Sequence, residues 1–447
     1  MNKESIKSAT LTVLVIISLF FTWNMWNLQP SYEEFQNNSF FESVPIGPER
    51  RTPYQVIRPR QLYIHTPETH FSTLDDQYLD GLWTEMQDWN YSLGNNKNIA
   101  QTYTEENFNN WIHSKAEAKI ELRFLDGIPL ETMKSMFEWD TETNDSIHFD
   151  RIYLNVPNEK EAQKVYFVST ENLKIVETSV NLPDANQFVS TIYNKKSEFS
   201  SYFAFETDIG NEIMLPDNII ELDSYQYLTD EINDERFKDA LFSNPRLVKQ
   251  DVNFSSNRYT DSKRELNIFP NEHLVRFVNP TLTESSVLEE DLLLEQSINY
   301  LNDHGGWTDD YLLFNIDKPN QQVRYVMSIG SIPILTSTEE YFGPTMISQR
   351  WGQNEIAIYE RPSYQLMTQI SSSNPISLIS GKEVAEILKA DQSIDKSKIE
   401  NIYIAYELGG STDQKYVKLT PSWCIEMKDG TLMKLKANQG RDKGGLE

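Results

Sequence analysis

The sequence predicts an α+β protein: a single N-terminal transmembrane helix, followed by an extracellular region of several domains in which mainly antiparallel sheets pack with helices. Three observations predict it. One uninterrupted apolar run lies near the start of the chain. Beyond it, segments with alternating apolar and polar residues follow one another at hairpin spacing. Helical patterns do not follow every strand, which favours an α+β order over an alternating βαβ chain.

The apolar run predicts the membrane segment. Residues 9–29 are mostly apolar or small hydroxyl residues, and no charge falls between Lys7 and Glu33. As a helix they span about 30 Å, the thickness of a bilayer core. Lys3 and Lys7 precede the run, so the positive-inside bias places residues 1–8 in the cytoplasm and the bulk of the chain outside the cell.

The end of this run favours a retained anchor over a cleaved signal peptide, because the run is long and no small-residue cleavage site follows it. Trp23 and Trp26 lie at the distal end, where amphipathic rings prefer the membrane interface. One helical face contains a pair of small residues four apart, which permits close approach of another helix. The predicted partner-helix face consists of Leu11, Val15, Ser18 and Thr22. The alternative is that these residues face lipid or their own backbone.

The first extracellular part begins with residues 30–60, whose prolines and polar residues predict a stalk or lead-in. Residues 61–205 predict a first α+β domain. In that domain, the segment 118–127 alternates Ile120, Leu122 and Phe124, which predicts a half-buried strand that ends in an Asp-Gly turn. The other expected elements are strands at 61–65, 149–156, 164–169 and 173–180, and helices at 72–93 (capped by Ser72 or Thr73), 104–114, 129–137 and 184–195.

The rest of the chain predicts a second α+β domain over residues 206–372, a third, smaller one over 373–437, and a flexible tail over 438–447. The expected helices are 230–242, 286–306 and 381–390, and the expected strands lie in 217–228, 264–280, 311–316, 321–335, 354–360, 364–370, 398–408 and 415–437. In both domains a helix precedes a long strand, a turn and a returning strand. An internal structural repeat is one interpretation, and a chance likeness of pattern is the other.

Composition limits the partners. Lys and Arg number 40 and Asp and Glu 67, so the net charge is -27. Such a chain repels phosphate backbones, and nucleic acid is not an expected partner. Cys424 is the single cysteine, so neither an internal disulfide nor a Cys/His zinc site is expected. A large exported chain without disulfides suits the outer face of a Gram-positive bacterium.

The sequence presents no catalytic constellation, so we expect no catalytic, cofactor-binding or metal-binding residues. Its paired acids are interpreted as solvated surface. His65 and His70 are the closest histidine pair, but no third ligand lies at a recognised spacing, so both are interpreted as structural. Cys424 lies in a strand-like segment and is interpreted as a buried thiol. Two alternatives stay open, an extracellular wall-polymer hydrolase and a ligand-binding sensor module.

Five segments together resemble the YycH family of Firmicutes: "TWNMWNLQPSYE", "VIRPRQLYIH", "FKDALFSNPRLVKQ", "GWTDDYLLFNID" and "LTPSWCIEMKDG". The resemblance covers essentially the full chain. It implies a non-enzymatic, membrane-anchored regulator of a WalK-like sensor histidine kinase that controls cell-wall homeostasis. It also implies a YycI-like partner and contacts made partly through transmembrane helices. No catalytic residues are implied.

Overall fold

The structure is a computed structural model. It describes residues 7, 11–15, 17–18, 45–93, 100–114, 118–140, 147–156, 162–180, 183–207, 212–253, 255–280, 287–336, 343–352, 355–409 and 415–435. The chain divides into two compact units, residues 1–42 and residues 43–447, and each is described by itself.

In the first unit, the described residues 7, 11–15 and 17–18 are helical, and their side chains are exposed. Within the described part of the chain, no helix is both long and apolar enough to cross a membrane. The other residues of the predicted transmembrane segment 9–29 lie outside the described residues, as do most of the predicted tail 1–8 and all of the predicted tail 438–447.

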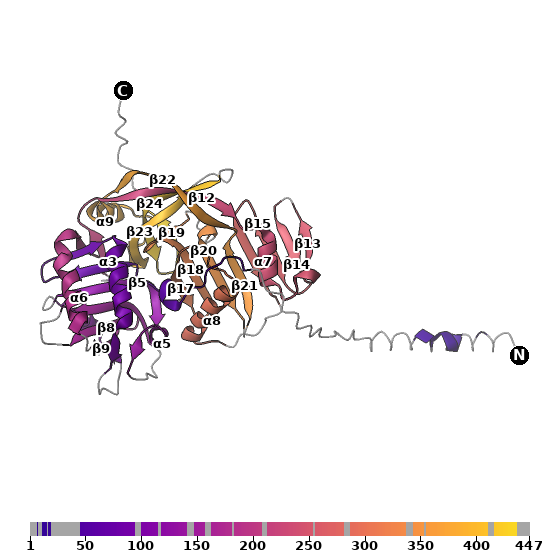
Figure 1. Cartoon of the computed structure of the whole chain (residues 1–447), viewed down its shortest axis with the longest axis horizontal. Helices are drawn as coiled ribbons and strands as arrows, with labels where there is room; N and C mark the ends of the chain where they lie inside the picture. The colour runs from indigo at the N-terminus through magenta and orange to yellow at the C-terminus, as the bar shows by residue number, and fades with distance from the viewer. Residues whose placement is uncertain are drawn as a thin grey trace, which may run out of the picture. The chain divides into compact units, whose positions relative to one another are not determined.

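The second unit contains two large sheets, of which the first is the N-terminal sheet (Figure 1). In the described chain its strands follow the order β11-β10-β2-β1-β5-β7-β8-β9-β3-β6, and β4 pairs with β9. Only the short contact of β3 with β6 is parallel among the described pairs. The strands are β1 (Gln61–His65), β2 (His70–Thr73), β3 (Asn90–Ser92), β4 (Ala100–Thr102), β5 (Lys119–Pro129), β6 (Glu138–Trp139), β7 (His148–Asn155), β8 (Gln163–Ser169), β9 (Lys174–Val180), β10 (Ser200–Glu206) and β11 (Glu212–Pro216).

The two faces of the N-terminal sheet differ because side chains alternate along each strand. On one face, Leu62 and Ile64 join the main core with residues of α3 (Asp76–Glu85) and α6 (Pro183–Asn194). These two helices lie side by side in Figure 1. On the opposite face, Tyr153 packs with Phe108 of α4 (Glu105–Ile112). This second face also contains a cluster of buried charges.

The second sheet is the C-terminal sheet. Its described strands follow the order β13-β14-β15-β16-β21-β20-β18-β19-β23-β24-β12-β22, with β17 beside β18 and β25 beside β24. The helix α8 (Glu290–Asp303) packs on β18, where Ser297 Oγ lies 2.8 Å from Tyr325 Oη. The strands are β12 (Ile220–Glu231), β13 (Lys249–Val252), β14 (Asn257–Thr260), β15 (Glu265–Phe269), β16 (Leu274–Val278), β17 (Tyr311–Asp317), β18 (Gln322–Ile329), β19 (Ile332–Leu335), β20 (Met346–Trp351), β21 (Ile356–Pro362), β22 (Tyr364–Leu378), β23 (Ile399–Gly409), β24 (Tyr416–Met427) and β25 (Leu432–Lys434). The remaining helices are α2 (Pro53–Val56), α5 (Leu130–Lys134), α7 (Asp234–Leu241) and α9 (Gly381–Ala390).

Carboxylates join the two sheets by accepting backbone hydrogen bonds. Asp126 Oδ2 in β5 accepts the N–H of Ile316 in β17 at 2.9 Å. Asp76 Oδ1, in the first turn of α3, accepts the N–H of Ser331 at 3.1 Å. Ile46, in the predicted lead-in, is buried and donates its N–H to His304 O at 2.9 Å. Backbone hydrogen bonds, as well as apolar packing, therefore hold the elements around the N-terminal sheet to those around the C-terminal sheet.

The mixed α+β class with large antiparallel sheets is confirmed. The predicted helix at 72–93 is too long at both ends: α3 covers only Asp76–Glu85. Ser72 and Thr73 belong to β2 and do not cap the helix. The cap is Asp75, whose carboxylate accepts the N–H of Gln77 at 3.0 Å. Asp75, directly before the helix, therefore serves as the N-cap in place of the hydroxyl residues further upstream.

The predicted half-buried strand at 118–127 is wrong in two respects. The polar residues Lys119, Glu121 and Arg123 are as buried as the apolar ones, so both faces of β5 are covered. The Asp-Gly pair is no turn, because β5 continues through Gly127 to Pro129 past an irregularity in its pairing with β7. The predicted domain boundaries stay predictions. The one between residues 372 and 373 falls inside β22.

Candidate functional site

The predicted partner-helix face is only partly described. Leu11, Val15 and Ser18 are helical and exposed. Thr22 lies outside the described residues, as do Trp23 and Trp26, the predicted membrane-interface anchors. The role of all six residues stays a prediction.

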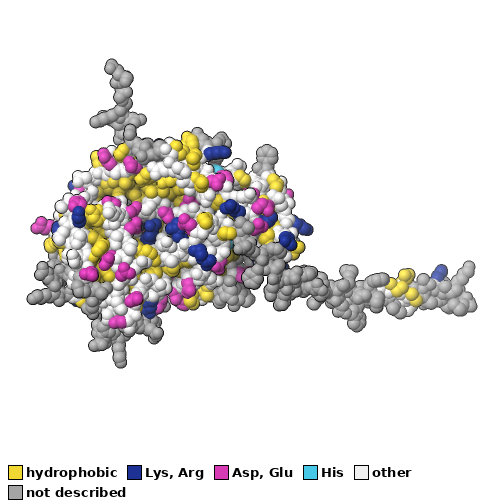
Figure 2. All heavy atoms as spheres, viewed as in Figure 1, with side chains coloured by type: hydrophobic (Ala, Val, Ile, Leu, Met, Phe, Trp, Pro, Cys, Tyr) yellow, Lys and Arg dark blue, Asp and Glu magenta, His cyan; other side chains and the backbone are white. Residues whose placement is uncertain are grey.

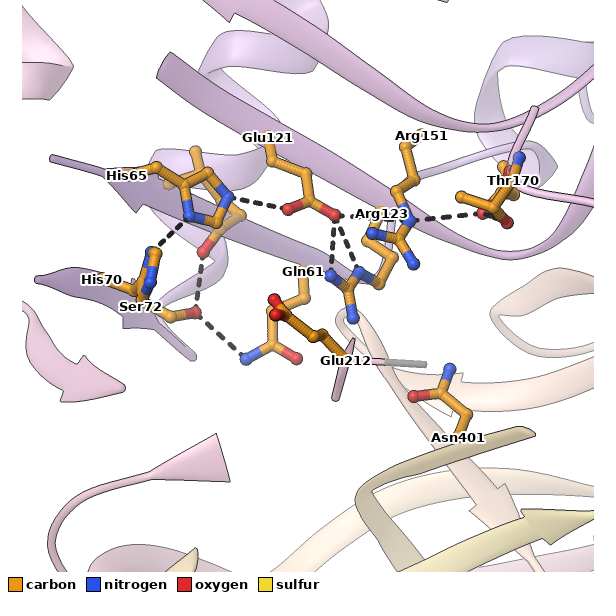
Figure 3. Close-up of polar contacts among 12 residues, drawn as sticks. Gln61, His65, His70, Ser72, Glu121, Arg123, Arg151, Thr170, Glu212 and Asn401 are labelled. Atoms are coloured by element: carbon orange, nitrogen blue, oxygen red, sulfur yellow. Dashed lines mark hydrogen bonds and ion pairs between the residues drawn. The ribbon is translucent and has the colours of Figure 1, made fainter. Parts of the chain in front are cut away.

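A cluster of buried charges joined by hydrogen bonds and ion pairs lies on the second face of the N-terminal sheet (Figure 3). We call it the Glu121 cluster, and it consists of Glu121, Arg123, Arg151, His65 and His70. Glu121 is 1% exposed and accepts from Arg123 Nε at 2.8 Å. Its other oxygen lies 2.7 Å from His65 Nε2, and Arg151 Nε lies 3.7 Å from the first oxygen. One carboxylate thus faces three groups that can carry positive charge.

Strand register brings these side chains together. Glu121 pairs with Tyr63 of β1 on one side and with Tyr153 of β7 on the other. Arg123, two residues further along β5, pairs with Arg151. Residues two apart on a strand share a face, as do residues directly opposite each other on paired strands. The alternation of the sequence therefore places both arginines beside Glu121.

The electrostatics of Glu121 argue against acid–base chemistry. Burial would raise the pKa of its carboxyl, but Arg123, Arg151 and His65 outweigh burial and hold that pKa well below its usual range. A carboxylate that stays ionised and has both oxygens engaged is a poor general acid. The cluster therefore fits a structural charge network better than a catalytic site.

One polar contact extends the cluster toward solvent. Arg151 Nε lies 3.3 Å from Asp150 Oδ2, and Asp150 accepts the N–H and the hydroxyl of Thr170, both at 2.7 Å. A separate pair, His113 Nδ1 and Glu212 Oε2 at 2.8 Å, acts on His70 only through space. The side chains of both pairs are more exposed than that of Glu121, so solvent access increases away from the centre of the cluster.

Six carboxylates elsewhere in the described second unit have raised pKa values, which is the feature that a wall hydrolase would need, and three of them are almost fully buried. Burial raises the pKa of Asp126 and of Asp309 to about 6, and that of Glu426 to about 7. Asp126 accepts the backbone N–H of Ile316 at 2.9 Å. Asp309 accepts the backbone N–H of Leu366 at 2.7 Å. Two of the three acids are thus engaged as structural acceptors rather than facing a cleft.

The single cysteine, the other candidate reactive group, is also buried. The prediction of a buried thiol is confirmed: Cys424 is 5% exposed in β24, and burial raises its pKa to about 12. Within the described ranges, no group of three or more His, Cys, Asp or Glu side chains is arranged to hold a metal ion. On the face drawn in Figure 2, Asp and Glu side chains are spread over the surface with Lys and Arg between them.

The sequence interpretation missed the Glu121 cluster. His65 and His70 were recognised as a pair, but their link to Glu121 was not. A signal was present, because Glu121 and Arg123 are opposite charges two residues apart in one strand. It was indistinguishable from a solvated strand face, since only the packing of α4 and of the C-terminal sheet decides that this face is covered.

Comparisons with known proteins show which family models this chain matches and which proteins it is similar to. The model "YycH protein, N-terminal domain" matches residues 4–197, and the model "YycH protein, C-terminal domain" matches residues 210–438. The chain is 30% identical over 455 residues to the "Two-component system WalR/WalK regulatory protein YycH" of Bacillus subtilis (strain 168), with 99% of each chain covered. It is also similar to the crystal structure of YycH from Bacillus subtilis, with a TM-score of 0.75 and 27% identity over 87% of this chain and 98% of that one.

Proposed function

The chain belongs to the YycH family, and we propose that it regulates a WalR/WalK-type two-component system as a non-enzymatic, membrane-anchored accessory protein of the sensor histidine kinase. In this proposal residues 1–8 lie in the cytoplasm, residues 9–29 span the cell membrane, and the bulk of the chain lies outside the cell. The partners are a WalK-like kinase, a YycI-like protein and the lipid bilayer. The regulated process is cell-wall homeostasis.

One observation carries the proposal: the similarity to the Bacillus subtilis regulatory protein runs over 99% of both chains. A likeness confined to one domain would leave the function of the rest open. The N-terminal family model begins at residue 4, so the matched region includes the predicted membrane segment as well as the sheets. The anchor and the extracellular body are therefore proposed to act as parts of one regulator.

The described residues of the first unit support the membrane part of the proposal. Their large apolar side chains are 44–67% exposed: Leu11, Val13, Leu14, Val15 and Ile17. At 100° per residue, these five side chains cover about 200° of the helix circumference, wider than the roughly 100° apolar stripe of a surface helix. Such a helix is favoured in lipid rather than in water.

The non-enzymatic part of the proposal is supported by the engagement of the candidate groups. Glu121 is held ionised between two arginines and a histidine. Asp126 and Asp309 accept backbone hydrogen bonds. A regulator needs partner surfaces rather than a reactive group, and the N-terminal helix supplies one.

Site-specific photo-crosslinking in intact membranes tests the proposal. A photoreactive amino acid replaces Val15, on the predicted partner face, in the full-length chain, and cross-linked proteins are identified by mass spectrometry. We expect a sensor histidine kinase or a YycI-like protein. The matched control replaces Val13, which lies about 160° around the helix from Val15 at 100° per residue. We expect weaker cross-links from that position. Recovery of neither protein from either position would refute the proposal.

A further inference from the structure

Arg60 is a buried cation at the junction of the two sheets. It directly precedes β1, it is 6% exposed, and its N–H donates to Arg123 O at 2.8 Å. Its guanidinium lies over the ring of Tyr403 in β23, with Cζ 4.6 Å from the ring centroid. The side chain thus extends from the N-terminal sheet onto a strand of the C-terminal sheet.

The guanidinium has no hydrogen-bond acceptor and no ion-paired carboxylate among the residues that the structure describes. Its Nε is fully buried without a partner. Burial lowers the pKa of Arg60, and the electrostatic contribution of Glu426 only partly offsets it. Glu426 itself has its pKa raised by burial to about 7, so it is only partly ionised near neutral pH. Buried charges in proteins are paired or bind ions, because an uncompensated buried charge costs several kcal/mol.

A small cavity of about 20 Å³ lies beside this guanidinium, between the two sheets. Its polar lining is rich in donors. The Tyr202 hydroxyl in β10 accepts from Gln61 Nε2 at 3.3 Å and also lies near Ser72. The buried Tyr403 hydroxyl has no nitrogen or oxygen partner within the described part of the chain, and the Cys424 thiol lies near it. The polar side chains that line the cavity include Arg60, Gln61, Tyr202 and Tyr403.

We propose that this cavity binds one small inorganic anion of the size of chloride, as the counter-ion of Arg60. The volume admits a single small particle, since one water-sized probe occupies about 10–15 Å³. A bound water molecule would satisfy hydrogen bonds but would leave the charge of Arg60 uncompensated. A peptide carboxylate or a sulfate is too large. The anion would join the two sheets, because its ligands come from β1 and β10 on one side and from β23 on the other.

Thermal unfolding of the full-length chain in detergent tests the proposal. Chloride replaces isethionate at fixed pH and fixed ionic strength. Above its Kd, each tenfold rise in chloride is expected to raise Tm by about 1–3 °C. Bromide is expected to substitute for chloride, whereas isethionate is too large for the cavity. Equal Tm values in chloride and isethionate would overturn the proposal.

Two variants locate the effect. Arg60→Gln is expected to abolish the dependence of Tm on chloride. The matched control, Arg50→Gln, changes an arginine whose side chain is 71% exposed, and it should keep the full dependence. An unaltered dependence in Arg60→Gln contradicts the site. If Arg60→Gln does not fold, crystals of the wild-type chain soaked in bromide decide: an anomalous peak beside the guanidinium supports the proposal, and no peak there overturns it.

Discussion

His65 and His70 face each other across the β1–β2 pair, with their Nδ1 atoms 2.7 Å apart. Because a carboxylate only accepts, His65 Nε2 donates its proton to Glu121. A neutral His65 ring accepts at Nδ1, and His70 then donates there. If both rings were protonated, two N–H groups would point at each other. The pair holds at most three of its four possible ring protons, so the native state resists protonation of both rings at once.

The first prediction concerns acid stability. Burial, reinforced by His65, lowers the pKa of His70 to about 4, whereas an exposed histidine titrates near 6.5. Between these values the unfolded chain binds more protons, so the free energy of unfolding falls as pH falls from about 6.5 to about 4. His70→Gln should reduce this loss by about 1–2 kcal/mol, allowing for solvent screening. Urea titrations at several pH values measure it.

His273 provides the control with the opposite sign. Its hydrogen bond to Glu231 raises its pKa, so its contribution is present below about 6.5 and is lost as pH rises through the raised value. His273→Gln should therefore leave the acid loss caused by His70 in place. Equal slopes in the His70→Gln variant and the wild-type chain would contradict the lowered pKa of His70.

The second prediction concerns the Glu121 cluster. Glu121→Gln removes the one carboxylate that faces both Arg123 and Arg151, and leaves two largely buried guanidinium groups without it. Breaking a buried ion pair in this way should cost about 3–5 kcal/mol in the free energy of unfolding. Asp303→Asn removes an exposed partner of Arg50 and should cost less than about 1 kcal/mol. Similar losses in the two variants would mean that Glu121 is effectively solvated.

The sequence was a good guide where the residues of a segment are mostly apolar or where a cap is clear. Segments at hairpin spacing predicted β8 and β9, and Thr104 correctly marked the start of α4. The sequence failed for β5, where polar residues are buried on the second face. Lys119, Glu121 and Arg123 have the composition of a solvated strand face, and local pattern carries no information on which distant element covers them.

The same limit explains the junction between the sheets. Asp76 is a normal first-turn acid of a helix, which the pattern explains without a further role. Its hydrogen bond to Ser331, 255 residues later, depends on tertiary packing alone. Arg60 likewise reads as an ordinary polar residue before a strand. Its burial follows only from the position of Tyr403 on a strand far along the chain.

The third prediction tests this junction. Gly330 has φ +59°, and a Cβ there would collide with the Asp76 carboxylate. Gly330→Ala should therefore lower the free energy of unfolding by about 2–4 kcal/mol, through backbone strain and the displaced carboxylate. Denaturant titration of the full-length chain measures it.

Gly81 provides the matched control. It lies within α3, the helix that carries Asp76, and a Cβ there meets nothing within 4 Å. Gly81→Ala should raise the free energy of unfolding by about 0.5–1 kcal/mol, because alanine favours the helix. A Gly330→Ala variant as stable as Gly81→Ala would mean that the junction adapts without cost.

The fourth prediction concerns the proposed partner face of the N-terminal helix. Replacing Ser18 and Thr22 together by Leu adds bulk where a second helix would approach most closely. Because such contacts contribute about 0.6–1.7 kcal/mol in membranes, co-purification with the kinase should fall roughly 3- to 20-fold. Quantitative immunoblotting after detergent extraction measures it. Thr12→Leu makes the same kind of change about 90° around the helix from the centre of the proposed face, and should leave the yield nearly unchanged. If the double variant binds as well as Thr12→Leu, these residues face lipid, and the kinase contact must lie on another surface of the chain.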